Sequence, residues 1–245
     1  MQDSIVQTVE ISPKRFLTLL LGIDIGLAIA GILSNLLTYF SDKNIDFLMM
    51  RFNLGAEESL PTWYSSFQLL ICAALLLLIG LRARKNEETF SRHWLGLSLL
   101  FLYISIDEIA TFRESVARLS QSYVNTSGIF YYTWVIVAIP AVALLALLYA
   151  KFIFQLPKQV KILVILAGGL FLSGAIGLEM VTALIHSNSG SQVLAEASPQ
   201  VNLAYSLVTT LEETFEIVGV TIFLYALSIY IKLKKITAVR FKIAH

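Results

Sequence analysis

Charged side chains are scarce in this chain. They make up 14% of its 245 residues, whereas hydrophobic residues make up 57%. About a quarter of the residues of a soluble domain are charged. Together with a mean hydropathy of +0.75, this composition excludes an ordinary soluble domain and predicts an integral membrane protein. We expect no nucleic-acid partner.

Cysteine and histidine are also few. Cys72 is the single cysteine of the sequence, so neither an internal disulfide nor a redox Cys-x-x-Cys pair can form. The histidines are His93, His186 and His245. They are too few for the histidine-rich sites of desaturases and ceramidase-like zinc hydrolases, and no Glu-x-x-His pair of a di-iron carboxylate bundle is present.

Six apolar segments have about the 20 residues that a membrane-spanning helix requires. They cover approximately residues 16–39, 64–81, 94–112, 130–150, 162–186 and 203–231. Asp24 interrupts the first segment and its apolar run continues to Phe40, so we interpret it as a retained helix and not as a cleaved signal. The connections leave no room for a soluble domain. We therefore predict one all-α transmembrane domain over residues 1–245, a bundle of six helices.

Basic residues are concentrated in alternate connections, which predicts the orientation of the helices. Of the 18 Lys and Arg residues, 14 fall before the first helix, after the sixth, or between helices two and three and helices four and five. By the positive-inside rule, both termini are cytoplasmic. We expect a bacterial plasma (inner) membrane location, with anionic lipid headgroups against the cytoplasmic face.

Local sequence patterns also predict an interfacial helix, two helix starts and a packing face. In the first outer connection, residues 47–52 are mostly apolar and predict a short helix lying in the membrane interface. Pro61 predicts the start of the second helix, and Ser198 with Pro199 predicts the start of the sixth. Gly169, Ser173 and Gly177 predict a small-residue packing face on the fifth helix.

Besides Asp24 in the first segment, acidic residues interrupt the third, fifth and sixth apolar segments, although a carboxylate in the bilayer costs about 2.5–3.5 kcal/mol. The acids of these three segments are the ones that follow. Counting along the helices at about 1.5 Å per residue places all of them in the outer half of the membrane. We therefore predict one outward-facing site that binds a proton or a cation. Its candidate residues are Asp107, Glu108, Glu114, Glu179, Glu212, Glu213 and Glu216, assisted by Arg113 and His186.

Several carboxylates that lie so close together cannot all be ionised without help, because like charge and desolvation both favour the protonated form. Either some hold protons or a cation lies among them. A divalent cation would be held by Glu179, His186, Glu213 and Glu216. In the alternative interpretation, the acids of the third helix lie at a hydrated helix end and pair with Arg113 and Arg118. These acids are Asp107, Glu108 and Glu114. Asp24 is expected to be a local hydrogen-bonding residue outside this site.

Three stretches together resemble a known group. They are Leu60-Pro61-Thr62-Trp63-Tyr64-Ser65-Ser66, Asp107-Glu108…Arg113-Glu114, and Leu211-Glu212-Glu213. The combination resembles an uncharacterised group of bacterial six-helix multipass membrane proteins, over most of the chain. The resemblance implies no activity. It implies a histidine where this chain has Arg113, a difference that removes one ligand and counts against a metal.

Three functions follow from these patterns. The first, which we favour, is handling of a proton or cation by transport, relay or sensing. Six helices are few for a transporter, so this function predicts a homo-oligomer or a membrane partner. The second is a metal-assisted or acid/base enzyme acting on a lipid or isoprenoid substrate. The third is a structural or assembly subunit. An apolar side pocket open to lipid would favour the enzyme.

The basic residues generate a first prediction. A reporter fused after His245 should be cytoplasmic, and one inserted in the loop 187–202 should be external, because Lys and Arg are retained on the cytoplasmic side. Reporter activity in cells measures both positions. The opposite pattern would contradict the outward orientation of the acidic residues.

Overall fold

The protein is seen in a computed structural model that describes residues 12–40, 51–112, 126–190 and 197–236. Within these ranges the secondary structure is helical. The helices are α1 (Pro13–Phe40), α3 (Leu60–Lys85), α4 (Ser91–Ala110), α6 (Trp134–Gln155), α7 (Lys158–Leu172), α8 (Glu179–Asn188) and α9 (Pro199–Leu233). A 3-10 turn, η1 (Gly128–Phe130), precedes α6, and a π-helical segment, η2 (Ser173–Leu178), joins α7 to α8.

Six spans are long and apolar enough to cross a membrane when α7, η2 and α8 are counted as one span, Lys158–Asn188. This confirms the predicted all-α bundle of six membrane helices and indicates an integral membrane protein. Of the predicted interfacial helix at 47–52, residues 47–50 lie outside the described residues, and Arg51 and Phe52 are helical.

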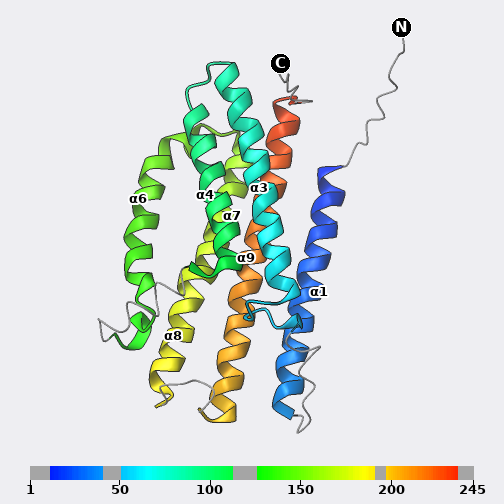
Figure 1. Cartoon of the computed structure of the whole chain (residues 1–245). Helices are drawn as coiled ribbons and strands as arrows, with labels where there is room; N and C mark the ends of the chain where they lie inside the picture. Colours follow the sequence, from blue (N-terminus) through cyan, green and yellow to red (C-terminus); the bar gives the residue numbers. More distant parts are fainter. Residues whose placement is uncertain (1–11, 41–50, 113–125, 191–196, 237–245) are drawn as a thin grey trace, which may run out of the picture.

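The first residue of α1 and the last residue of α9 lie at the same end of the bundle (Figure 1). The last turns of α3 and α9 carry Arg82, Lys85 and Lys232 at this end, which we call the basic end. The opposite end, where α1 stops and α9 begins, is called the far end. The placement of the basic end in the cytoplasm stays a prediction.

Both predicted helix starts are confirmed by their caps. Ser59 precedes α3, and its Oγ accepts a hydrogen bond from the backbone N–H of Thr62 at 3.3 Å. Ser198 precedes α9, and its Oγ accepts one from the N–H of Val201 at 3.4 Å. In each helix a proline occupies one of the first two positions, where its missing N–H leaves no hydrogen bond unmade.

Small hydroxyl side chains join α3 closely to α4. Ser66 Oγ donates to the carbonyl of Ser105 at 2.7 Å, and Ser105 Oγ donates to the carbonyl of Ser66 at 2.8 Å. Nearer the basic end, Ser98 Oγ donates to the carbonyl of Ala73 at 2.8 Å. Such small residues let helices approach and hydrogen-bond within a membrane.

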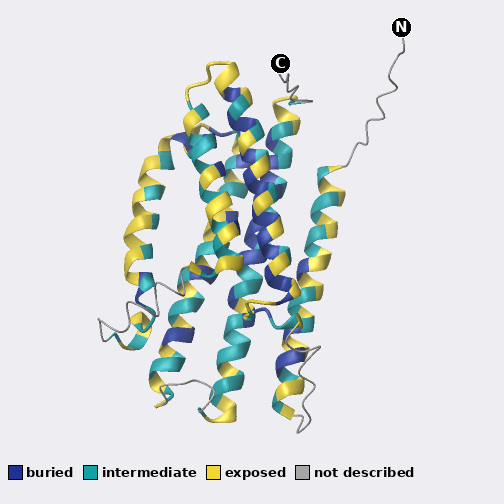
Figure 2. Cartoon of the chain, viewed as in Figure 1, coloured by how far each residue is buried: buried dark blue, intermediate teal, exposed yellow. Residues whose placement is uncertain are grey.

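Helix α9 forms the centre of the bundle and packs against α1, α3, α7 and α8. The buried residues are concentrated along α9 and α3 (Figure 2). Toward the basic end they form an apolar core in which Leu76, Leu224 and Leu227 are fully buried. Trp94 closes this core, with its ring 4.8 Å from those of both Phe152 and Tyr230.

The predicted small-residue face of the fifth helix is wrong. A methyl group added at Gly169 or Gly177 would meet no atom within 4 Å. The contact with α9 uses Gly174 instead, where an added Cβ would lie 2.7 Å from the backbone oxygen of Glu212. The π-helical turn inserts an extra residue here, so the regular helical register assumed from sequence does not hold across η2.

This contact generates a second prediction. Gly174→Ala should lower the stability of the protein by about 1–3 kcal/mol, because the new methyl group forces η2 and α9 apart. Gly177→Ala is the matched control in the same π turn, and it should be neutral or slightly stabilising because alanine favours helix. Melting temperatures of the purified proteins in detergent measure both. Equal effects of the two substitutions would contradict the packing described.

Candidate functional site

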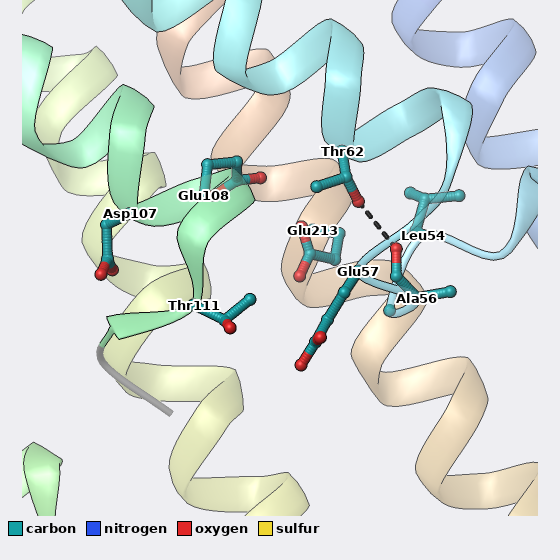
Figure 3. A pocket seen from close by; sticks show the side chains of 9 residues that line it. Leu54, Ala56, Glu57, Thr62, Asp107, Glu108, Thr111 and Glu213 are labelled. Atoms are coloured by element: carbon teal, nitrogen blue, oxygen red, sulfur yellow. Dashed lines mark hydrogen bonds between the residues drawn. The ribbon is translucent and has the colours of Figure 1, made fainter. Parts of the chain in front are cut away.

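A small polar cleft lies between α3, α4, α9 and the loop that precedes α3. It has room for about 40 Å³, which is about three water molecules at ~10–15 Å³ each. Its acidic lining residues are Glu57, Asp107, Glu108 and Glu213, and Thr62 and Thr111 add hydroxyl groups. In Figure 3, Glu108 and Thr111 point toward Glu213, whereas Asp107 lies on the other side of the last turn of α4.

The loop before α3 is held inside the bundle by its own contacts. Leu54 is buried, and its side chain fills the space beside Gly31 of α1. Thr62 Oγ1 donates to the carbonyl of Ala56 at 2.8 Å. Within a membrane, non-helical backbone is tolerated where protein encloses it or where it lines a hydrated cavity. Here it forms one wall of the polar cleft.

The end of α4 forms the opposite wall. Thr111 adopts the left-handed conformation, with φ 51° and ψ 36°, and its N–H donates to the carbonyl of Asp107 at 2.8 Å. This conformation costs a residue with a side chain roughly 1–2 kcal/mol. The helix therefore ends shortly after Asp107 and Glu108, with a strained residue at the cleft, as is common at functional sites.

A second group of acids lies beside the cleft, between α8 and α9. The carboxyl groups of Glu179 and Glu212 are within hydrogen-bonding reach of each other. Glu212 is 5% exposed, and Trp134 Nε1 donates to Glu179 Oε1 at 3.1 Å. Because Gly174 packs against the backbone of Glu212, the π-helical segment sets the distance between the two helices at this pair. We call Glu179 and Glu212 the carboxyl pair.

An aromatic chain leads from the carboxyl pair toward the far end. Tyr205 lies near both Glu179 and Glu212. Its hydroxyl is 3.0 Å from that of Tyr132, which in turn is 3.3 Å from Nδ1 of His186. Hydroxyl and imidazole groups both donate and accept hydrogen bonds, so this chain is suited to passing a proton.

The structure thus brings the predicted site residues together in two neighbouring groups. Asp107, Glu108 and Glu213 line the cleft, and Glu179 and Glu212 form the carboxyl pair. Glu216 is buried one turn deeper on α9, and His186 ends the aromatic chain. Arg113, Glu114 and Arg118 lie outside the described residues.

Sequence reasoning missed several residues at the site. Trp134, Tyr132 and Tyr205 are aromatic residues of a kind that commonly marks a membrane interface, so nothing in the pattern distinguished them from such anchors. Glu57 and Thr62 reach the cleft because the loop before α3 folds inward. That path depends on tertiary contacts, for which the sequence offers no periodic signal.

The predicted metal-binding set is not assembled. In the part of the chain that the structure describes, no three side chains of His, Cys, Asp or Glu are grouped so that they could hold a metal ion. Glu179, His186, Glu213 and Glu216 are instead distributed between the carboxyl pair, the aromatic chain, the cleft and the deeper turn of α9.

Comparison with known proteins places the chain in a family. Residues 21–231 match the family described as "Domain of unknown function (DUF8692)". The match covers most of the sequence, and the chain therefore belongs to this family. No curated protein and no solved structure matches it significantly.

Proposed function

We propose that this member of the DUF8692 family handles protons in the membrane, with Glu179 and Glu212 as its working groups. The observation that supports this most directly is that their carboxyl groups lie close enough to interact, with Glu212 buried and Glu179 half-buried. Ionised carboxylates are acceptors only, so a hydrogen bond between two of them requires a shared proton. The pair is therefore a place where one proton is held.

The surroundings of the carboxyl pair favour this shared proton. Glu213 and Glu216 act on Glu212 as further acidic groups, and like charge in a poorly solvated site disfavours a second ionised carboxylate. The Trp134 N–H donates to Glu179 and so stabilises that side chain as the acceptor. In this proposal, Glu212 donates the hydrogen bond of the shared proton and Glu179 accepts it.

Protons have a route from the pair toward the far end. The chain Tyr205–Tyr132–His186 continues from the carboxyl pair in that direction. Toward the basic end, the buried polar residues Glu216 and Thr221 of α9 are followed by the apolar core, in which Leu224 and Leu227 are fully buried. This supports exchange of protons with the far side, which the predicted topology places outside a bacterial plasma membrane, in a relay or a sensor.

A second candidate function, an acid/base enzyme acting on a lipid or isoprenoid, is favoured by an apolar cavity of about 350 Å³. Binding pockets for small molecules measure about 300–1,000 Å³. The walls of the cavity come from α3, α4, α6, α7 and α9, and they include Leu100 of α4 and Leu145 of α6. Its size and lining suit a hydrocarbon chain.

The cavity ends close to the acidic groups. On α4 it reaches Ile104, one helical turn before Glu108, and on α9 it reaches Gly219 and Val220, one turn after Glu216. An amphipathic lipid could therefore place its chain in the cavity and its polar head at the cleft. Positioned carboxyl groups would then act on the head as general acid and base.

The proton hypothesis predicts the behaviour of Glu212→Gln. The folded protein holds a proton at the carboxyl pair that the unfolded chain releases at neutral pH, so its stability should fall as pH rises. The amide keeps a donor toward Glu179 without a titrating proton. Glu212→Gln should therefore be at least as stable as wild type near neutral pH and lose this part of the pH dependence. Melting temperatures across a pH series in detergent measure it.

Glu213→Gln is the matched control, because it removes a carboxyl group from the adjacent residue, which lines the cleft. It should retain a pH dependence of stability from the carboxyl pair, with its midpoint moved to lower pH, because one acidic group that acts on Glu212 is removed. A Glu212→Gln protein that is clearly less stable than wild type, together with a wild type that does not respond to pH, would identify Glu212 as a structural residue and end the proposal.

The lipid candidate is tested by filling the cavity. Gly168 lines it, and an added Cβ there would meet no atom within 4 Å, so Gly168→Phe should occupy space that a lipid chain needs. Gly169→Phe is the control, because Gly169 is exposed and does not line the cavity. Mass spectrometry should find a co-purified long-chain lipid with wild type and Gly169→Phe and much less with Gly168→Phe. Equal lipid content in all three proteins would contradict this candidate.

A further inference from the structure

Asp24 belongs to a buried polar network that is separate from the carboxyl pair. It is 2% exposed, and Tyr64 Oη donates to its Oδ1 at 2.7 Å. Gln68 Nε2 donates to the hydroxyl oxygens of Tyr64 and Thr221, at 2.8 Å each. The sequence suggested a local hydrogen-bonding role for Asp24, but these contacts join α1 to both α3 and α9.

Two oxygen atoms of this network are buried without a hydrogen-bond partner. They are Oδ2 of Asp24 and Oε1 of Gln68, in side chains that are 2% and 1% exposed. Both atoms are acceptors, so each needs a donor or a cation. Buried polar atoms in native proteins are nearly always paired, which means that a donor or a cation is expected at this place.

The charge of Asp24 also calls for a donor or a cation beside it. The groups that act on its carboxylate in the described part of the chain are the phenol of Tyr64 and the amide of Gln68 from α3, and the hydroxyl of Thr221 from α9. All three are neutral at physiological pH. An ionised carboxylate buried among neutral groups is unfavourable unless a positive charge compensates it.

We propose that Asp24, Gln68 and Thr221 form a binding site for one monovalent positive charge, either a proton or a sodium ion. The carboxylate, amide and hydroxyl oxygens are the ligand type that hard cations take. A proton on Oδ2 would equally neutralise Asp24 and would convert an unpaired acceptor into a donor. This site does not depend on the proposed function of the carboxyl pair.

Asp24 and Thr221 both lie in the half of the bundle nearer the basic end, where α1 begins and α9 stops. Asp24 is 11 residues, about 17 Å, along α1 from its start at Pro13. Thr221 lies eight residues, about 12 Å, beyond Glu213 toward the basic end. Beyond Thr221, the buried residues Leu224 and Leu227 belong to the apolar core. The site is therefore deeper than the cleft and is sealed from the basic end.

The test uses the full-length protein in detergent. Its melting temperature is measured across a pH series, with sodium chloride replacing choline chloride at constant ionic strength. If sodium is the ligand, sodium should raise the melting temperature at alkaline pH and lose this effect at acid pH, where a proton competes. If the ligand is a proton alone, the melting temperature should fall with rising pH and not respond to sodium.

Asp24→Asn should abolish whichever response is found, because the amide is neutral at every pH. Asn35→Ala is the matched control, since Asn35 is a buried neutral residue of α1 that donates to Thr210 of α9 at 2.8 Å. It should lower the melting temperature but keep the response. The same melting-temperature series in a Glu212→Gln background removes the contribution of the carboxyl pair. The Asp24 site and the carboxyl pair are therefore tested independently of each other.

Identical pH and sodium responses in wild type and Asp24→Asn would overturn the proposal and leave a bridging water as the partner of the two oxygens. If Asp24→Asn does not fold, Thr221→Val and Gln68→Leu decide instead, because both leave Asp24 in place. Either variant should weaken the sodium response or shift the midpoint of the pH response. Responses unchanged from wild type in both variants would contradict the site.

Discussion

A carboxyl group that is buried among apolar helices must either keep a proton or acquire a positive partner, because the membrane interior does not solvate a bare negative charge. In the proposed function, Glu179 and Glu212 meet this requirement together by sharing one proton. Asp24 is a second buried carboxyl group with only neutral hydroxyl and amide groups around it in the described part of the chain, so the proposed proton or sodium ion would meet the same requirement there.

Helix packing positions the carboxyl pair. Helix α9 is central, and the close approach of Gly174 to the backbone of Glu212 brings the fifth span against it. The π-helical segment η2 then leads directly into Glu179, the first residue of α8. π-helical turns are frequent at functional sites. Here the turn couples the distance between two helices to the distance between two acids.

The apolar cavity and the cleft come within one helical turn of each other along α4. Ile104 lines the cavity and Glu108, one turn later on α4, lines the cleft. A ligand with a long apolar chain and a polar head would fit this arrangement, with the chain in the apolar cavity and the head at the polar cleft. Proton handling and lipid chemistry are therefore compatible uses of one site, because an acid/base enzyme also requires a carboxyl group that holds and releases a proton.

The sequence predicted the six helices because long apolar runs and Ser-Pro caps are local signals. It also predicted that acids from three helices lie at one depth, because helical rise converts residue number into distance. It did not predict the pairing of Glu212 with Glu179, since the π-helical turn changes the register. It also did not predict the contacts of Asp24 with Tyr64, because those residues meet only through packing of α1 against α3 and α9.

The shared proton of the carboxyl pair is the central claim, and infrared difference spectroscopy tests it most directly. Spectra of wild type and of the Glu212→Gln variant are compared at neutral pH. A shared proton predicts a protonated carboxylic acid band in wild type that shifts in heavy water and is missing from the variant. A difference spectrum with ionised carboxylate bands alone would show that both acids of the pair are charged, and would contradict the claim.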